Sequence, residues 1–472
     1  MRRDHTDKTF ILVATIVVLL LLMHLLPEVS IGDITMRRVS ILSDISDSPL
    51  DKEQPDVIPK PKEPSAEERG LKSKSGKKIT FQEIWPDSIQ RVVDFSAGGA
   101  HGMGHFYAML DSLVRHRPIG RPLRIAYYGD SFIEGDILVA DLREKLQSKY
   151  GGNGVGWIDA GNGLNKYKPS VNATSSGLVE HMVMKKEGYQ VALAGLAERY
   201  YPAGIGSTMT VKGLSEYPHA SKWGVSRLYL RARQGATLAV KGDGGEAENK
   251  MLPAKDGVQT TELLMPTSHF NCKVSSGSPT LFGVALETDN GVVVDNFSMR
   301  GSSGITLSQL PMQTLSNFNR ERPYDLIIFQ FGVNAISASS GKQHFEWYMG
   351  HMRKVVELYK QCFPTTSILV MSTPDRGSHS GGVIGTMKGI ETLVAYQEQL
   401  AADCHVGFYN LFEAMGGRGS MGKLCSQGMG SKDYVHISYK GGRHISQFIF
   451  NSFVTGQQNW SRRQKILNEN IE

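Results

Sequence analysis

Residues 123–151 read LRIAYYGDSFIEGDILVADLREKLQSKYG, and this stretch decides the fold. Its first part, LRIAYYGDS, is a short apolar run that ends in a Gly-Asp-Ser turn, which is typical of a strand buried on both faces. Residues 138–150 have helical periodicity, and Gly151 is expected to end that helix. Strand, turn and helix in this order form the repeating unit of a parallel α/β sheet.

The same order returns in the last third of the chain. Apolar runs typical of buried strands are YDLIIFQFGVNA (324–335), SILVMSTPD (367–375) and HVGFYNL (405–411). Amphipathic stretches typical of helices are HFEWYMGHMRKVVELYKQCF (344–363), ETLVAYQEQLAADC (391–404) and HISQFIFNSFV (444–454). Together they predict an α/β domain with a parallel sheet covered by helices on both faces, and with its reactive groups on loops at the carboxyl ends of the strands.

Between these two blocks the helical period disappears. Short β-type runs such as SRLYLRARQ (226–234) and TLFGVALE (280–287) alternate with Gly, Ser, Pro and Asp clusters, which predicts an inserted β-sandwich with its own core over residues 166–287. The α/β domain is then split into residues 80–165 and 288–460, and residues 461–472 form a tail. Four aromatic residues of the insert have two interpretations, packing in its core or stacking against a glycan. They are Tyr200, Tyr201, Tyr217 and Trp223.

The N-terminal part has a different character. Residues 10–26, FILVATIVVLLLLMHLL, carry no charge and would span about 25 Å as a helix, which predicts an uncleaved transmembrane signal anchor, with a cleaved signal peptide as the alternative. Residues 1–9 would stay in the cytoplasm, and the body of the protein would be exported. Residues 27–79 are rich in Pro, Lys, Glu and Ser and predict a disordered linker.

Composition excludes several classes of protein. Lys and Arg number 52 and Asp and Glu 46, and the resulting charge of +6 is spread along the chain without the basic cluster of a nucleic-acid-binding protein. Four scattered cysteines, Cys272, Cys362, Cys404 and Cys425, are too few for a disulfide framework and include no C-x-x-C pair for a structural zinc site. The sequence does not decide whether Cys404 and Cys425 form a single disulfide.

Four short motifs in the α/β blocks carry groups suited to acyl transfer. They are Gly129-Asp130-Ser131, Asn296-Phe297-Ser298-Met299-Arg300-Gly301, Gly332-Val333-Asn334 and Asp433-Tyr434-Val435-His436. A serine between a strand and the positive end of a helix can act as nucleophile, a histidine can accept its proton, and an aspartate three residues earlier can orient the histidine. A glycine N–H and an asparagine amide can donate to the developing oxyanion.

Each motif also has a purely structural interpretation. Ser131 could cap a helix, Asn334 could form an Asx turn, and His436 could be a surface histidine beside a helix start. The conjunction of all four in one chain, at predicted strand ends and at the last helix start, favours a catalytic site.

These motifs resemble the four blocks of the SGNH (GDSL-type) hydrolase superfamily. The resemblance implies a three-layer α/β/α fold, a triad of Ser131, Asp433 and His436, and an oxyanion hole formed by Ser131, Gly301 and Asn334. Gly304, three residues further on, is the alternative glycine donor. The sequence departs from the family pattern after Ser131, where Phe132 follows, and after Asn334, where Ala335 follows.

The motif RIAYYGDSFIEGD followed by a β-module is similar to bacterial peptidoglycan or polysaccharide O-acetylesterases, whose inserted module resembles carbohydrate-binding domains. The resemblance implies a serine esterase, and residues 10–26 add the prediction that it is tethered to the cell inner membrane, with its body in the periplasm or outside the cell. Its substrate would be an acetylated polysaccharide, and a membrane-bound acyltransferase would be a further partner. Neither a cofactor nor a metal would be required. Two alternatives remain, a polysaccharide O-acetyltransferase with the same triad and a non-catalytic carbohydrate-binding protein.

Overall fold

The computed structural model describes residues 6–23, 30–31, 34–35, 58–64, 81–117, 119–380 and 383–469. These residues divide into two units, residues 1–57 with 379–383, and the remainder of the chain. The predicted linker over residues 27–79 lies largely outside the described residues.

The first unit holds helix α1 (Thr6–Met23) and the short strands β1 (Ser30–Ile31) and β2 (Ile34–Thr35), which pair antiparallel. Among the residues described in full, no helix combines the length and the apolar character that crossing a bilayer demands. The signal anchor over residues 10–26 therefore stays a prediction.

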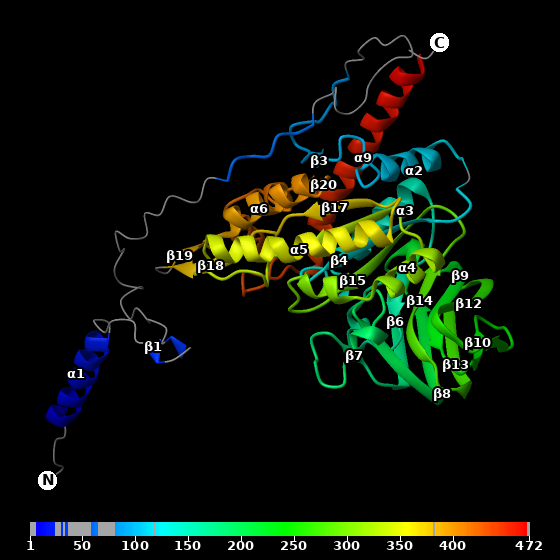
Figure 1. The fold of residues 1–472 in the computed structure, drawn as a ribbon, viewed down its shortest axis with the longest axis horizontal. Helices are drawn as coiled ribbons and strands as arrows, with labels where there is room; N and C mark the ends of the chain where they lie inside the picture. Colours follow the sequence, from blue (N-terminus) through cyan, green and yellow to red (C-terminus); the bar gives the residue numbers. More distant parts are fainter. Residues whose placement is uncertain are drawn as a thin grey trace. The chain divides into compact units, whose positions relative to one another are not determined.

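The second unit is built on a six-stranded sheet (Figure 1). Its strands follow the order β15 (Val292–Ser298), β4 (Leu123–Gly129), β16 (Leu326–Gln330), β17 (Ser367–Met371), β20 (Gly407–Tyr409) and β3 (Val92–Asp94). All neighbours are parallel except β3, which runs antiparallel to β20. The predicted parallel sheet is confirmed.

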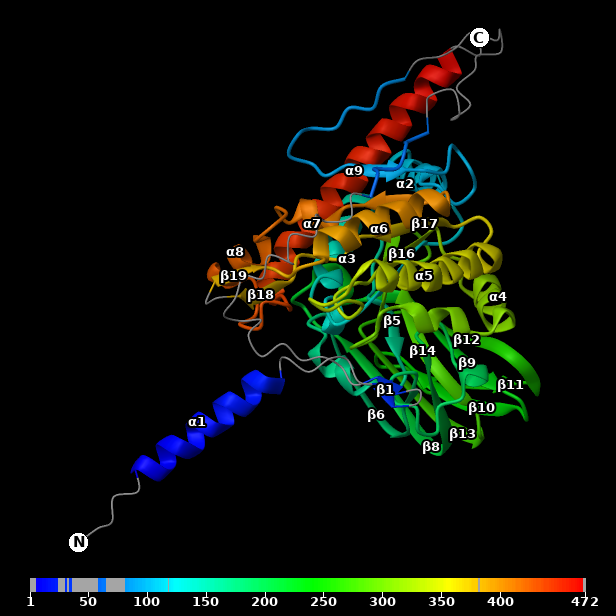
Figure 2. The same ribbon diagram turned by 60° about the vertical axis from the view of Figure 1, so that its left-hand side comes forward.

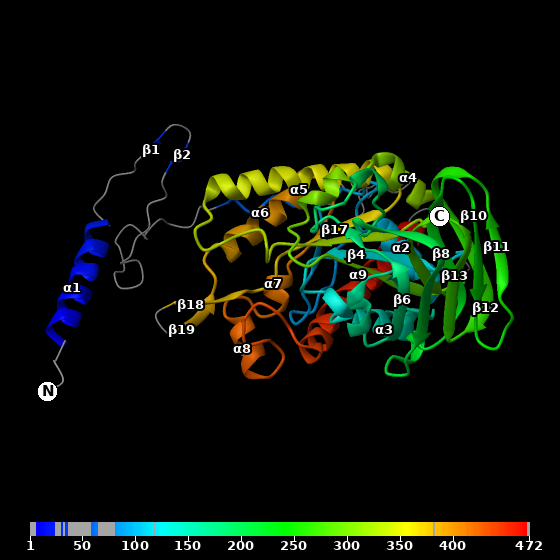
Figure 3. The same cartoon turned by 90° about the horizontal axis from the view of Figure 1, so that it is seen from below.

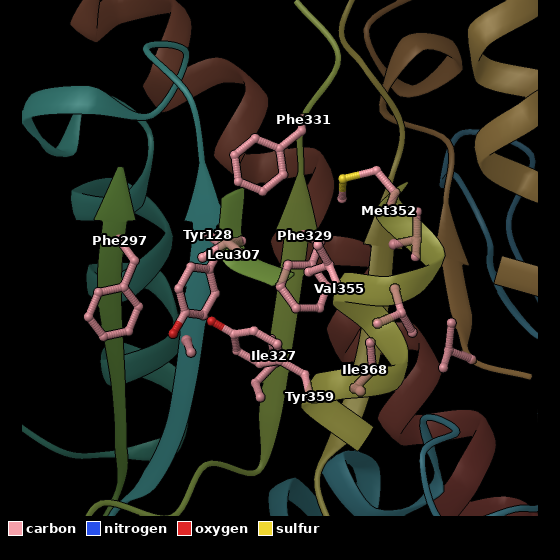
Figure 4. Close-up of a cluster of buried hydrophobic side chains, with 14 of the residues drawn as sticks. Tyr128, Phe297, Leu307, Ile327, Phe329, Phe331, Met352, Val355, Tyr359 and Ile368 are labelled. Carbon is pink, nitrogen blue, oxygen red and sulfur yellow. The ribbon is translucent and has the colours of Figure 1, made fainter. Parts of the chain in front are cut away.

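Successive side chains of β4 enter two different cores, because strand residues alternate between faces. Ile125 and Tyr127 pack with α2 (Gly104–Val114), α3 (Val139–Tyr150) and α9 (Tyr439–Glu469), whereas Ala126 and Tyr128 pack with α4 (Met312–Glu321), α5 (Lys342–Cys362) and α6 (Ile390–Asp403). Figure 3 shows the helices on both sides of the sheet. Figure 4 shows the second core, where the Tyr128 and Phe297 rings stack with their centroids 4.8 Å apart.

The region between the two α/β blocks is rich in β structure, as predicted (Figure 2). Its strands are β5 (Gly156–Asp159), β6 (Val171–Leu178), β7 (His181–Met182), β8 (Arg199–Gly213), β9 (Trp223–Ala232), β10 (Ala236–Lys241), β11 (Glu248–Leu252), β12 (Lys255–Thr267), β13 (His269–Gly277) and β14 (Thr280–Glu287). The long β8 pairs with β14 near its start and with β13 and β6 further on, so it joins two sheets that enclose one core. The first strand of this region, β5, begins at Gly156 and pairs with β14, ten residues before the boundary predicted at residue 166.

The insert shares its second face with the α/β domain. Phe318 of α4 packs against Trp157, Tyr229 and Phe282 of the insert, and all four side chains are buried. Beside them Arg322, which is fully buried, binds Asp295 at 2.7 Å and Glu287 at 2.9 Å, while Arg124 binds Glu287 at 2.6 Å. The insert therefore has a core of its own between its two sheets, whereas its other face forms a common core with the α/β domain.

Several short elements connect the larger ones. They are the 3-10 turns η2 (Glu134–Asp136), η3 (Gly163–Tyr167), η4 (Val191–Leu193), η5 (Pro218–Ala220) and η6 (Ile305–Gln309), the strands β18 (Gly377–Ser380) and β19 (Val383–Thr386), and the helices α7 (Leu411–Ala414) and α8 (Ser420–Ser426). Residues 461–469, which the sequence predicts to be part of a tail, continue α9. All four cysteines are unpaired, so Cys404 and Cys425 form no disulfide.

Candidate active site

Three adjacent strands end side by side. Ser298 of β15, Gly129 of β4 and Gln330 of β16 lie in register, and each strand continues into one of the first three motifs. Because parallel strands present their carboxyl ends at one edge of a sheet, the Ser131, Gly301 and Asn334 loops gather at that edge. The structure thus brings three predicted motifs together, although Ser131 and Asn334 lie 203 residues apart in the sequence.

The fourth motif completes a hydrogen-bonded chain of side chains. Ser131 Oγ lies 2.8 Å from His436 Nε2, and His436 Nδ1 lies 2.7 Å from Asp433 Oδ2. Asp433 Oδ1 also accepts hydrogen bonds from the backbone N–H groups of Val435 at 2.9 Å and His436 at 3.0 Å. Burial alone would raise the pKa of Asp433, but these hydrogen bonds outweigh it and lower the pKa, so the carboxylate is ionised at neutral pH.

Ser131 is not a helix cap. Asp130 Oδ1 accepts a hydrogen bond from Phe132 N at 2.9 Å and Glu134 N donates to Ser131 O at 3.3 Å, which continues the turn into η2. Helix α3 starts only at Val139, with Leu138 in its N-cap position. Ser131 therefore lies between β4 and α3, and the 3-10 turn η2 stands between it and the helix start.

A buried asparagine holds this turn in place. Asn296 Nδ2 donates to Ile133 O at 2.8 Å and to Asp136 Oδ1 at 2.9 Å, which ties the segment after Ser131 to the end of β15. Burial would raise the pKa of Asp136, but Arg143 at 3.0 Å and Lys168 at 3.7 Å outweigh burial and lower it. Asn296 opens the second motif, yet nothing in a single sequence distinguishes it from an ordinary turn residue.

The two candidate glycine donors differ in their surroundings. Gly304 N donates to Ser302 Oγ at 3.0 Å, and a Cβ on Gly304 would come within 2.6 Å of the Phe331 ring, so this glycine serves packing. Gly301 has φ +78°, a conformation that favours glycine, and within the described part of the chain its N–H has no hydrogen-bond partner. Gly301 is therefore the glycine whose N–H can serve an anion.

Asn334 faces the Gly301 loop rather than its own backbone. Its Nδ2 donates to Ser302 O at 3.3 Å, which replaces the Asx turn considered from the sequence. Arg376 donates from Nη1 to Val333 O at 2.7 Å and so fixes the Asn334 loop. The amide that was predicted as an oxyanion donor thus lies beside the predicted glycine donor.

Asp130, the middle residue of the first motif, has no role predicted from the sequence. Its side chain is buried, and Oδ2 has no hydrogen-bond partner within the described part of the chain. Burial raises the pKa of this carboxyl group to about 7. An acid that is partly protonated at neutral pH therefore stands next to Ser131.

The site is open to solvent, and the insert borders it. The side chains of Asp433 and His436 are 50% and 38% exposed. From the insert, Arg199 Nη2 donates to Ser298 O at 3.0 Å, and Met184 Cε lies 3.5 Å from where a Cβ on Gly301 would be. The insert thus contacts Ser298 of the second motif and lies close to Gly301.

Comparison with known proteins agrees with this architecture. A solved peptidoglycan O-acetylesterase superposes with a TM-score of 0.64 at 20% identity, covering 78% of this chain and 99% of its own. The chain shares the fold of that enzyme. This confirms at the level of the fold the resemblance drawn from the four motifs.

Other comparisons add less. A family two carbohydrate esterase from Cellvibrio japonicus is 11% identical, with 62% of this chain and 99% of that chain covered, and its TM-score of 0.25 establishes no shared fold. A family two carbohydrate esterase from Clostridium thermocellum, solved with cellohexaose, is 11% identical with a TM-score of 0.25, covering 56% of this chain and 95% of that chain. Neither the family models nor the curated proteins give a match.

The aromatic residues considered as glycan-stacking surfaces in the insert are all buried: Tyr201, Tyr217 and Trp223 lie in the insert's own core, and Tyr200 lies in the core that the insert shares with the α/β domain. Their exposed fractions are 4% or less for Tyr200, Tyr201, Tyr217 and Trp223. The alternative stated with them, a role in a core, is the correct one, because large rings are buried both between the two sheets of the insert and where the insert packs on the α/β domain.

Proposed function

We propose that the protein is a serine esterase that removes O-acetyl groups from a cell-envelope or other polysaccharide through an acyl-serine intermediate. The observation that carries this proposal is the continuous hydrogen-bonded chain from Ser131 through His436 to Asp433. The shared fold with a peptidoglycan O-acetylesterase supports the choice of a carbohydrate ester as substrate.

The chain of hydrogen bonds provides the first step. Asp433 accepts the Nδ1 proton of His436, so Nε2 is left as the acceptor that faces Ser131 Oγ. When Oγ attacks the acetyl carbonyl carbon, its proton moves to Nε2, and the ionised Asp433 stabilises the imidazolium that results. His436 then returns the proton to the departing sugar oxygen, and an acetyl-Ser131 ester remains.

The neighbouring loops stabilise the charge that develops on the carbonyl oxygen. The backbone N–H groups of Ser131 and Gly301 and the Nδ2 group of Asn334 are the proposed donors. Water activated by His436 attacks the acetyl-Ser131 carbonyl in the second half of the reaction, releasing acetate and restoring the serine.

The openness of the site favours hydrolysis over transfer to a second sugar. A transferase has to keep water from the acyl group while it admits a sugar hydroxyl. With Asp433 half exposed and His436 more than one-third exposed, water reaches the acid–base pair directly. The O-acetyltransferase is therefore the second candidate.

We also propose that the protein is exported and tethered to the cell inner membrane, with its body in the periplasm or outside the cell. The support is the uncharged stretch of residues 10–26 and the polar segment that follows it. A membrane-bound acyltransferase as partner rests on the sequence resemblance alone. Recovery of the full chain in the soluble fraction of a cell lysate would contradict the tether.

The deciding experiment uses the purified full-length protein, a chromogenic acetyl ester and candidate oligosaccharide acceptors, with acetate and acetylated sugar followed by mass spectrometry. We expect acetate at a rate independent of the acceptor, and a loss of at least about 10³-fold in Ser131→Ala. Ser337→Ala is the matched control, because Ser337 is exposed and, among the described residues, its Oγ hydrogen-bonds only to the neighbouring Ser339 and Ser340. Full activity of a folded Ser131→Ala protein would refute the nucleophile, and acetylated sugar formed faster than acetate would favour the transferase.

A further inference from the structure

Two exposed tyrosines lie close to the segments that carry Ser131 and His436. Large exposed side chains are scattered over the second unit, but Tyr167 (54% exposed) and Tyr439 (41% exposed) lie together. Tyr439 begins α9, three residues after His436, and Tyr167 ends η3 at the start of the insert. The two rings therefore come from sequence positions 272 residues apart.

Direct contacts join the two tyrosines to each other and to the turn that carries Ser131. The Tyr439 hydroxyl donates a hydrogen bond to Tyr167 O. A Cβ on Gly135, which lies four residues after Ser131, would come within 3.3 Å of Tyr167 Cβ and 3.6 Å of the Tyr439 oxygen. Gly135 has φ +64°, a conformation that favours glycine, and at this residue the η2 turn passes close to Tyr167 Cβ and the Tyr439 hydroxyl group.

The contacts hold the rings while leaving them exposed. The hydrogen bond from Tyr439 to the backbone of Tyr167 uses the polar end of one side chain. Lys166 Nζ lies 5.0 Å from the centroid of the Tyr167 ring, which restrains that ring through a cation–π contact. A flat aromatic side chain loses little entropy on binding, so a pair fixed in this way is well suited to packing against a ligand.

We infer that Tyr167 and Tyr439 form a binding surface for a sugar ring of the ester-bearing glycan, on the His436 side of the reacting atoms. The apolar C–H face of a pyranose can pack on an aromatic ring, as other apolar groups do. This inference rests on the proposed function and deepens it. It assigns the insert a direct part in substrate binding, since Tyr167 belongs to the insert as predicted from the sequence.

Binding can be measured without turnover. In a Ser131→Ala background, we expect the Kd for a β-1,4-linked N-acetylglucosamine pentamer or for cellohexaose to rise about tenfold in Tyr167→Ala, by calorimetry. Tyr439→Phe keeps its ring and loses only the hydrogen bond to Tyr167, so its effect should be smaller. Leu264→Ala is the control, because Leu264 is 70% exposed on β12 of the same insert.

A kinetic measurement complements it. With Ser131 present, the ratio of kcat/KM for an O-acetylated oligosaccharide to kcat/KM for a small acetyl ester should fall about tenfold in Tyr167→Ala, mainly through KM. Tyr167→Leu keeps an apolar side chain and separates loss of the aromatic face from loss of bulk. Thermal unfolding of each variant shows whether the fold is retained.

The outcomes separate the two proposals. Unchanged Kd and an unchanged kinetic ratio in Tyr167→Ala would overturn the binding surface while leaving the esterase standing. No binding of either oligosaccharide to the Ser131→Ala protein would equally count against the surface. Weaker oligosaccharide binding in Tyr167→Ala, in a chain that cleaves no acetyl ester, would support the surface and remove the proposed function.

Discussion

Replacing Asp433 by asparagine isolates the orienting role of the carboxylate. In the structure Asp433 Oδ1 accepts two backbone N–H groups, of Val435 and His436, and Oδ2 accepts the ring proton of His436. In Asp433→Asn the amide oxygen can keep both backbone bonds, so the turn is retained. The amide nitrogen then faces His436 Nδ1 at the position where Oδ2 lies 2.7 Å away.

A donor at that position selects the wrong tautomer. His436 Nδ1 has to become the acceptor, so the ring proton moves to Nε2, the atom that lies 2.8 Å from Ser131 Oγ. Nε2 can then no longer take the serine proton. The expected cost is on the order of 10⁴-fold in kcat, the size found for the same replacement in a serine protease triad.

The assay compares kcat and KM of Asp433→Asn and Asp433→Ala on a chromogenic acetyl ester at neutral pH, with thermal unfolding as the control for folding. We expect both variants to lose activity, and Asp433→Asn to keep the thermal stability of the parent more closely because it retains the two backbone bonds. An Asp433→Asn protein with more than about a tenth of the parental kcat would refute the tautomer argument.

Three further replacements test other parts of the site and its support. Asn334→Ala should lower kcat by roughly 10²–10³-fold with little change in KM, as for loss of one oxyanion donor, whereas a change in KM alone would place Asn334 in binding. Arg322→Ala leaves Asp295 without its buried partner and should cost about 3–5 kcal/mol of unfolding free energy in urea, so a loss below about 1 kcal/mol would contradict the importance of this pair. Burial raises the pKa of Asp130 from 3.8 to about 7, so the stability that it contributes in the protonated form is lost as pH rises from about 4 to 7. Asp130→Asn should abolish that loss and gain up to about 4 kcal/mol over the parent at pH 8 but almost nothing at pH 4, and equal urea midpoints of the two proteins at pH 8 would contradict it.

The parallel sheet was predictable because its signals are local. A strand such as β4 is buried on both faces and therefore appears as an unbroken apolar run, and the same holds for β16 and β17. Motif residues at the ends of such runs must meet at one edge, so the amino-acid sequence alone places Ser131 and Asn334 near each other. The η2 turn between Ser131 and α3 was not predicted, because its sequence has no pattern that separates it from the start of a helix.

Burial of individual side chains in the insert could not be predicted in the same way. Tyr200 and Tyr167 both lie in polar, irregular stretches of sequence, yet Tyr200 is 2% exposed and Tyr167 is 54% exposed. The difference arises from long-range packing, since Tyr200 stacks on His181 with centroids 5.0 Å apart, whereas Tyr167 lies above the η2 turn. The alternation of apolar and polar residues along a strand does not show which other part of the chain covers that strand.

The shared face of the insert also changes what the insert can do. A module attached only by its two ends would bind glycan independently of the reaction. Here Glu287, the last residue of β14, is held by Arg124 of β4 and by Arg322, and Arg199 binds the end of β15. Because β4 leads to Ser131 and β15 leads to Gly301, the insert is fixed to the same two strands that position the proposed nucleophile and oxyanion donor. If the insert binds substrate as proposed, the substrate would be held in a defined position relative to the reacting groups, so binding the polymer would also orient its ester for attack.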